Sequence, residues 1–296
     1  MLNKIRHYIN NYRTILHATY SDFKMNKRHL ANRQNGGTEV DFATLRMYCH
    51  MLDKAMNRPS FEKGHSKDVY KKARELQNKL CSDYAQDTAF TWASEILNKF
   101  ENAQISGIIE IEQCDYKTYD NEEKKFISQF ISSRTSCRNF IEKEMPSDVL
   151  NEIVRLAADA PNGCCRQSVR YYITQNKELI GKLVPNVAGI TNFTNIQGLV
   201  AVCSESSFYE LCDKYLQYVD ASLSAENFIL AARVYGIFGT MCNFFHANEV
   251  EQNNVRKILG IKESENVVMF MAIGYPSKVP CKPERRDVSS FLKIRN

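Results

Sequence analysis

The chain has 296 residues, 44% of them apolar, and a formal net charge of +5. A chain of this length and composition can bury a sizeable core and form about two domains, so it is not a small protein held together by disulfides. Its longest strongly apolar stretch, residues 266–275, is shorter than the roughly 20 residues that span a membrane, and we expect no membrane insertion.

The positive charge is concentrated near the N-terminus, where residues 1–65 carry eleven Lys and Arg against five Asp and Glu. Such a segment is typical of binding to nucleic acid or an anionic surface, but a solvated helix accounts for it equally well, and we expect no nucleic-acid partner. The start, MLNKIRHYINNYRTIL, lacks the unbroken apolar run and the cleavage site of a secretory signal. We therefore predict a soluble, cytoplasmic protein.

Up to about residue 119 the sequence predicts helices joined by polar turns. In residues 40–56, apolar side chains recur every three or four positions, which predicts a helix with one apolar face. Residues 68–84 and 89–100 repeat the pattern, and the single tryptophan, Trp92, is expected in the core. The polar stretch 112–125 predicts a linker, so we divide the chain into a helical N-terminal extension, residues 1–120, and a second domain, residues 121–296.

The second domain alternates predicted helices and strands. We expect helices at 146–161 and about 213–236, the latter followed by a turn opened by Gly236 and Gly239. Strands are expected at 169–174, 198–203 and 266–275. This order predicts an α+β domain with a helix-covered sheet. A doubly wound dinucleotide fold is not expected, because no Gly-x-Gly-x-x-Gly follows a strand.

Two arginines and two hydroxyls crowd into the segment SRTSCRNF, residues 133–140. Arg134 and Arg138 offer bidentate cationic donors, and Thr135 and Ser136 offer short hydroxyl donors, which is the set that a phosphate needs. A solvated turn with surface arginines has the same composition, and both interpretations stay open for this segment alone.

The loop APNGCCRQ, residues 160–167, has a composition that lets a flat ligand approach the backbone. Pro161, Asn162 and Gly163 free the chain there, and the Gln167 amide can both donate and accept a hydrogen bond. Taken alone, this composition is also that of a helix stop.

The same loop carries adjacent cysteines, Cys164 and Cys165, among ten cysteines with no Cys-x-x-Cys spacing. A metal or thiol-catalysis site made with His246 is one alternative. Adjacent cysteines rarely chelate one ion together, however, and reduced, mostly buried thiols are the simpler expectation.

Residues 218–243 form an almost wholly apolar and small-residue segment, with Asp220, Glu226 and Asn227 embedded in it. A helix that is apolar most of the way round is buried on several sides, within the domain or against a second subunit. After the last strand, a proline-broken tail ends in Arg285 and Arg286.

Taken together and in this order, the segments resemble the nitroreductase family of FMN-dependent oxidoreductases over about residues 122–286. The matching residues are Arg134, Ser136 and Arg138 of an Arg-x-Ser-x-Arg segment, Ala160, Pro161 and Gln167 of an Ala-Pro-Ser-x-x-Asn-x-Gln-Pro loop, Asn227, Leu230, Ala231 and Ala232 of the long helix, and Ile273 to Pro276 of an Ile-Gly-Tyr-Pro strand end.

The resemblance implies a mainly antiparallel sheet flanked by helices, and a homodimer with FMN in each of two interface clefts. It implies NADH or NADPH as electron donor and an organic acceptor, such as a nitroaromatic, a quinone or an enone, in a ping-pong reaction whose hydride chemistry belongs to the flavin. The FMN-binding residues that it implies are Arg134, Thr135, Ser136 and Arg138 with Arg285 or Arg286 at the phosphate, Pro161, Asn162, Gly163, Cys165 and Gln167 in the ring-facing loop, and Asn243 near the reactive edge.

Three positions depart from the family pattern. Cys165 stands where the family has an Asn, Ser168 replaces a Pro, and Glu226 replaces a Gln. A thiol is a poorer hydrogen-bond partner than an amide, so flavin affinity or potential is expected to differ. The extension resembles that of nitroreductase-like proteins encoded among surface-polysaccharide genes. This leaves a second interpretation, a non-catalytic or specialised module in surface-polysaccharide synthesis.

Overall fold

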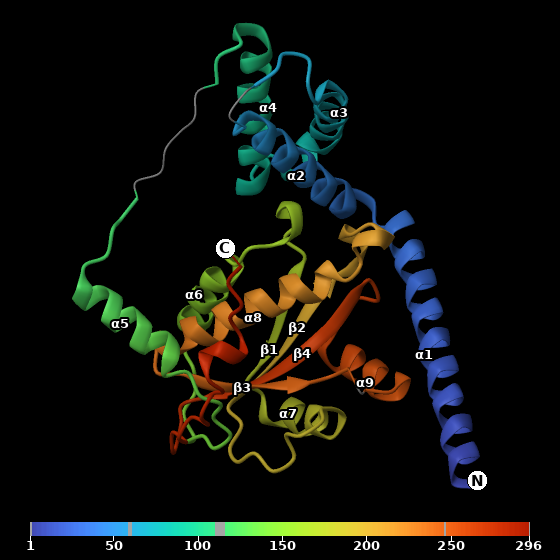
Figure 1. The fold of residues 1–296 in the computed structure, drawn as a ribbon, viewed down its shortest axis with the longest axis vertical. Helices are drawn as coiled ribbons and strands as arrows, with labels where there is room; N and C mark the ends of the chain where they lie inside the picture. Colours follow the sequence, from blue (N-terminus) through green and yellow to red (C-terminus); the bar gives the residue numbers. More distant parts are fainter. Residues whose placement is uncertain (1, 59–60, 110–115, 246, 296) are drawn as a thin grey trace.

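The computed structural model describes residues 2–58, 61–109, 116–245 and 247–295. The N-terminal part is helical, as its sequence predicts (Figure 1). Its elements are α1 (Leu2–Gln34), α2 (Gly37–Met56), α3 (Lys67–Tyr84) and α4 (Thr88–Ser106). Helices α2, α3 and α4 pack together at one end of the molecule, whereas α1 runs along its side.

The apolar faces predicted for α2, α3 and α4 form one core. Leu45 and Leu52 of α2 are fully buried against Leu80 of α3 and against Leu97 and Phe100 of α4. Burying several such side chains at about 1.5–3 kcal/mol each holds the three helices together. Trp92, expected in the core, is half-buried and packs against the edge of this core.

The expected linker is shorter than its composition predicts. Helix α5 (Asn121–Ser132) begins inside it, because Asp120 accepts a hydrogen bond from the Glu123 amide and Glu123 reaches back to the Asp120 amide. This capping box satisfies two donors that a helix start otherwise leaves open. Residues 112–115 of the expected linker lie outside the described residues.

The second part is an α+β domain around a four-stranded, antiparallel sheet in the order β1-β2-β4-β3. The strands are β1 (Val169–Thr174), β2 (Gly198–Glu205), β3 (Phe238–Asn243) and β4 (Glu265–Gly274). Its helices are α6 (Ser147–Ala158), α7 (Lys177–Leu183), α8 (Leu216–Val234) and α9 (Glu249–Leu259). The fold class predicted from the sequence is confirmed.

Both faces of the sheet are covered (Figure 1). Alternate residues of β2 point in opposite directions, so that Val200 and Val202 pack with α6 and α8, whereas Leu199 and Ala201 pack with α7 and α9. Every residue of β2 is buried, which explains why this strand reads as a continuous apolar run.

The predicted turn after α8 is only partly correct. Gly236, with φ of +72°, does end the helix, but Gly239 lies within strand β3. A Cβ at Gly239 would come within 2.9 Å of the Ala272 carbonyl oxygen and of an Ile273 side-chain carbon. Glycine is therefore required there by the close approach of β4 rather than by a turn.

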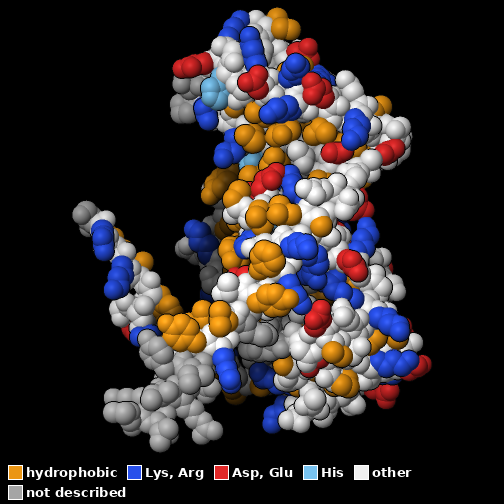
Figure 2. Space-filling model, turned by 90° about the vertical axis from the view of Figure 1, so that its right-hand side faces the viewer, with side chains coloured by type: hydrophobic (Ala, Val, Ile, Leu, Met, Phe, Trp, Pro, Cys, Tyr) orange, Lys and Arg blue, Asp and Glu red, His pale blue; other side chains and the backbone are white. Residues whose placement is uncertain are grey.

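Helix α1 leaves an apolar row exposed. Tyr12, Leu16, Tyr20 and Phe23 are all exposed at helical spacing. Figure 2 views the side on which α1 lies and shows apolar side chains running from the helices at the top towards the middle of the molecule. Among the described residues, no helix is both long and apolar enough to span a bilayer.

The C-terminal half of α1 docks against the α+β domain through a buried histidine. His29 is buried and its Nε2 lies 2.9 Å from the Tyr209 carbonyl oxygen. Burial lowers the pKa of His29 below its usual value, although the bond to Tyr209 opposes the shift. The folded protein therefore holds this imidazole neutral, as a donor to the carbonyl.

We expect the unfolding free energy to fall as the pH drops below about 6.5, because the unfolded state then binds a proton that folded His29 resists. Each such group contributes at most about 1.4 kcal/mol per pH unit. His29→Gln keeps the donor without the titration and should reduce the loss of stability between pH 7 and pH 5. Denaturant unfolding at several pH values measures this loss of stability.

The control is His65→Gln, because His65 is exposed. If the unfolding free energy of His29→Gln changed with pH as steeply as that of the parent protein, the assignment would be contradicted.

Candidate functional site

The arginine-rich segment lies between α5 and α6, alongside strand β3. The Cys137 amide donates to the Gly239 carbonyl at 3.2 Å, and the Thr240 hydroxyl donates to the Cys137 carbonyl at 2.5 Å. Of the predicted phosphate ligands, Thr135 is buried, Ser136 half-buried and Arg138 exposed. The hydroxyl of Ser136 and the guanidinium of Arg138 are therefore the more accessible of these groups.

Arg134 lies near two charged side chains of α8, Glu226 and Arg233. Its Nε lies 3.9 Å from a carboxylate oxygen of the exposed Glu226, which is a weak pairing. Burial lowers the pKa of Arg233, and the nearby positive charge of Arg134 lowers it further. The Arg233 guanidinium also lies over the rings of Phe130 and Phe238.

The Nε atom of Arg233 is buried and has no hydrogen-bond partner among the described residues. Two adjacent guanidiniums, one with an unsatisfied buried donor, form an environment that favours an anion. Sequence reasoning did not single out Arg233, because it belongs to a long apolar helix. The one sequence feature that could have indicated its role is the position of this charged residue in the last turn of an otherwise mainly apolar helix.

The loop of residues 160–167 has an unusual backbone. Cys164, Cys165 and Gln167 have φ values of 55°, 55° and 52°, in the left-handed region that disfavours residues other than glycine. Such a conformation persists only when surrounding contacts over-determine it. The contacts come from three directions: α8, the sheet and α2.

Helix α8 holds the start of the loop through Asp220. The Gly163 amide donates to both carboxylate oxygens of Asp220, at 3.0 and 2.9 Å. Asp220 is buried and also accepts from the Tyr209 hydroxyl at 2.7 Å. Burial raises the pKa of Tyr209, so this phenol stays protonated and donates.

The end of the loop is tied to the sheet by Ser168. Its buried hydroxyl is hydrogen-bonded to the Ser204 hydroxyl of β2 and to the Tyr209 hydroxyl. Proline, which the nitroreductase pattern has at this place, offers no such hydroxyl. The substitution therefore belongs to a buried polar network that joins β2, Tyr209, Asp220 and the loop.

Helix α2 of the N-terminal extension holds the middle of the loop. The Arg46 guanidinium donates to the Cys165 carbonyl at 3.2 Å and to the Arg166 carbonyl at 2.6 Å. It lies over the Phe42 ring at 4.3 Å, and burial lowers its pKa to about 10. Arg166 is itself buried and pairs with Asp213 at 2.8 Å.

Cys165, which stands in the place of the family's asparagine, faces α2. Its sulfur lies 3.6 Å from Nδ1 of His50. Burial, and then the charges of Cys164 and Asp53, raise the pKa of the Cys165 thiol. The protonated thiol is a poor nucleophile and a poor metal ligand.

The metal alternative receives no support from the structure. Among the described residues, no three His, Cys, Asp or Glu side chains group to hold a metal ion. His246, the third member of that hypothesis, lies outside the described residues.

The remaining predicted site residues lie on the exposed side of β3 and in the tail. Asn243 ends β3, and its side-chain oxygen accepts from the Phe245 amide at 2.8 Å. Arg285 and Arg286 are exposed. The tail returns towards α5, because the Lys282 ammonium donates to the Ser132 carbonyl at 2.8 Å.

Within one chain, the predicted residues therefore form two groups along α8. The loop is bound to Asp220, near the start of the helix, and Arg134 faces Glu226, about two turns further along. Sequence reasoning missed Arg46 and Tyr209, which hold the loop from outside it. A lone arginine on the apolar face of α2 was the only sequence signal for the first of these.

The chain matches the model of the Nitroreductase family over residues 131–215 and 213–275. It is 25% identical over 149 residues to an Archaeoglobus fulgidus protein assigned as an NADH dehydrogenase/NAD(P)H nitroreductase, spanning 50% of this chain and 84% of that protein. A protein from Methanothermobacter thermautotrophicus with the same assignment is 23% identical over 158 residues, 53% of this chain and 81% of that one.

The fold agrees with these matches. The structure of a nitroreductase-like protein from Streptococcus mutans superposes with a TM-score of 0.52 and 18% identity, covering 58% of this chain and all of that one. Helices α1 to α4 lie outside the residues that the family model matches. Residues 131–275 of this chain thus form a domain of the nitroreductase family.

Proposed function

We propose that this chain is an FMN-dependent oxidoreductase that uses NADH or NADPH to reduce an organic acceptor, working as a cytoplasmic homodimer. Family membership supports the oxidoreductase class. The observation that carries the FMN proposal is the pair Arg134 and Arg233, with the unsatisfied, buried Nε of Arg233. When bound, the flavin would supply the hydride chemistry, and the chain would bind and orient it.

The charges at the proposed phosphate end support FMN as the ligand. The phosphate carries close to two negative charges, and Arg134, Arg138 and Arg233 with the Ser136 hydroxyl supply cationic and neutral donors around β3. The exposed Arg285 and Arg286 of the tail would add charge from the same side of the domain, since the tail returns to α5.

The ring end differs from the family pattern. The Gly163 amide is used by Asp220, and the Cys165 thiol faces His50. The loop retains the exposed Pro161 and Gln167 and the half-buried Asn162. The side-chain oxygen of Asn162 accepts a hydrogen bond from the backbone amide of Gln167. We propose that these three residues face the ring and that Cys165 acts only through packing.

An exposed apolar row on α8 supports a second subunit. Val219 and Leu223 of α8 are exposed at a spacing of four residues, Tyr215 just before the helix continues the row, and the opposite side of the helix is buried in the domain. Such a row on a central helix is most economically covered by another copy of the chain. The copy would bring its own loop and arginine cluster towards the same helix.

The absorption spectrum of the purified protein tests this function. We expect a yellow protein whose flavin is released on denaturation and is bleached by NADH or NADPH under anaerobic conditions. A colourless protein that cannot be reconstituted with FMN would contradict the proposal.

Arg134→Ala is expected to weaken FMN binding by about 1.5–3 kcal/mol, roughly tenfold to a hundredfold, because it removes a charge-assisted phosphate contact. Fluorescence titration of apoprotein with FMN measures the change. Arg155→Ala on α6, where the arginine is bonded to Glu152, is the control and should bind FMN normally. Equal affinity in the two variants would show that the phosphate lies elsewhere.

The docking of α2 on the loop favours a second candidate, a specialised or non-catalytic module acting in surface-polysaccharide synthesis. Arg46 and His50 contact the part of the loop that the family resemblance assigns to the flavin ring. Bound flavin that is rapidly reduced by both NADH and NADPH would contradict this second candidate. Protein that binds FMN without being reduced would favour it.

A further inference from the structure

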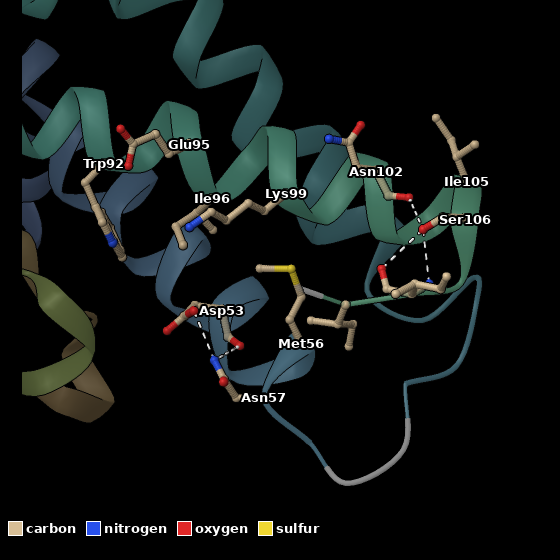
Figure 3. A pocket seen from close by; sticks show the side chains of 12 residues that line it. Asp53, Met56, Asn57, Trp92, Glu95, Ile96, Lys99, Asn102, Ile105 and Ser106 are labelled. Atoms are coloured by element: carbon tan, nitrogen blue, oxygen red, sulfur yellow. Dashed lines mark hydrogen bonds between the residues drawn. The ribbon is translucent and has the colours of Figure 1, made fainter. Parts of the chain in front are cut away.

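A cavity of about 600 Å³ lies between α2 and α4 of the helical extension (Figure 3). Its apolar lining includes Met56 of α2 and Trp92, Ile96 and Ile105 of α4. Pockets that enclose small molecules typically measure 300–1,000 Å³ and have mainly apolar walls with a few polar groups. The cavity therefore has the size of a small-molecule site, and its lining combines these apolar side chains with a similar number of polar ones.

The charged groups of the lining have opposite signs. Asp53 and Glu95 contribute carboxylates, and Lys99 contributes an ammonium group. Figure 3 shows the Lys99 side chain extending from α4 across the space towards Trp92, with Asp53 on the facing helix. Asp53 also accepts from the Asn57 amide at 3.1 Å. Two carboxylates and one ammonium leave a formal charge of −1 on the lining, which disfavours an anionic ligand.

The cavity is connected to the nitroreductase domain by one face of α2. Arg46, His50, Asp53 and Asn57 follow one another at spacings of four, three and four residues, so they form a single stripe. Arg46 and His50 contact the loop at Cys165, whereas Asp53 and Asn57 line the cavity. The stripe from His50 to Asn57 spans about 10 Å.

We propose that this cavity binds an uncharged, mainly apolar aromatic compound, with its ring against Trp92 and its polar groups towards the side-chain amides. The site lies outside the residues matched to the nitroreductase family and uses none of the proposed flavin ligands. The same face of α2 that lines the cavity with Asp53 and Asn57 contacts the loop through Arg46 and His50. The binding itself does not depend on the proposed function.

The single tryptophan makes the site directly observable. We would titrate the full-length protein with N-phenyl-1-naphthylamine, an uncharged fluorophore that can accept energy from tryptophan. The expected result is saturable quenching of Trp92 emission with matching sensitised emission of the probe, both in the presence and in the absence of FMN.

Ile105→Asn should weaken probe binding about tenfold by removing an apolar wall of the cavity. Ile105 is 73% exposed, so the substitution leaves the helical core intact. Ile131→Asn is the matched control, because Ile131 is 55% exposed, is also the next-to-last residue of its helix, and lies away from the cavity. It should bind the probe like the parent.

Three results would overturn the inference. They are probe emission without energy transfer from Trp92, equal affinity in Ile105→Asn and Ile131→Asn, and Trp92 emission that changes on dilution without probe. The last would show that a second copy of the chain covers the cavity. Failure of the protein to bind FMN leaves the proposal standing, since the titration needs no flavin.

Discussion

Asp220→Ala is expected to lower the free energy of unfolding by about 3–5 kcal/mol, because it removes a buried carboxylate that accepts three hydrogen bonds. Asp220 is 2% exposed, and its partners are the Gly163 amide and the Tyr209 hydroxyl. The amide would lose its acceptor inside the protein, and the hydroxyl would keep only Ser168. Denaturant unfolding followed by circular dichroism measures the change.

Two variants on α8 sharpen this test. Asp220→Asn keeps an oxygen for the Gly163 amide, so it should cost less than Asp220→Ala. Glu226→Ala removes an exposed carboxylate from the same helix and should change stability by no more than about 0.5 kcal/mol. If Asp220→Ala were as stable as Glu226→Ala, the carboxylate would not be the group that holds the loop.

Arg46→Ala should destabilise the protein by about 3 kcal/mol and free the loop. Arg46 is 5% exposed and supplies two charge-assisted hydrogen bonds, to the carbonyls of Cys165 and Arg166. Without them, the middle of the loop loses its contacts with α2, and the left-handed residues Cys164 and Cys165 relax more readily, although Asp220 and Ser168 still hold the two ends of the loop. Denaturant unfolding measures the free energy, and hydrogen exchange at the loop amides measures the local opening.

Arg46→Lys provides the conservative comparison, because lysine keeps the charge but lacks the planar fork that reaches two carbonyls. We expect a loss of stability between that of the parent and that of Arg46→Ala. Lys54→Ala, at an exposed position of the same helix, is the control. Unchanged exchange at the loop in Arg46→Ala would mean that α2 covers the loop without positioning it.

Helices α2, α3, α4, α6 and α8 and most strands could be predicted from the sequence because their apolar side chains repeat with the period of the backbone, whereas α7 and α9 were not predicted. The apolar face of α2 and the continuous apolar run of β2 are local patterns, and the structure confirms both elements. Strand β3 was missed because its glycine resembles a turn signal. Only the close approach of β4 explains Gly239 as a strand residue.

The candidate site was predictable in part. The order of the arginine segment, the loop and the long helix indicates the family, and the family model agrees with it. The role of Cys165 was not predictable, because its contact is with His50, 115 residues earlier in the chain. Residue type alone could not show that this thiol faces the helical extension.

By itself, therefore, the sequence determined the helical extension, the α+β class and the nitroreductase resemblance, all of which rest on short-range periodicity or on the order of segments. Only the tertiary structure decided what holds the loop. Arg46 is 119 residues from Cys165, and Asp220 is 57 residues from Gly163. These partners meet because apolar burial brings α2 and α8 against the loop, and a hydrogen bond forms only between groups that burial has already placed within reach.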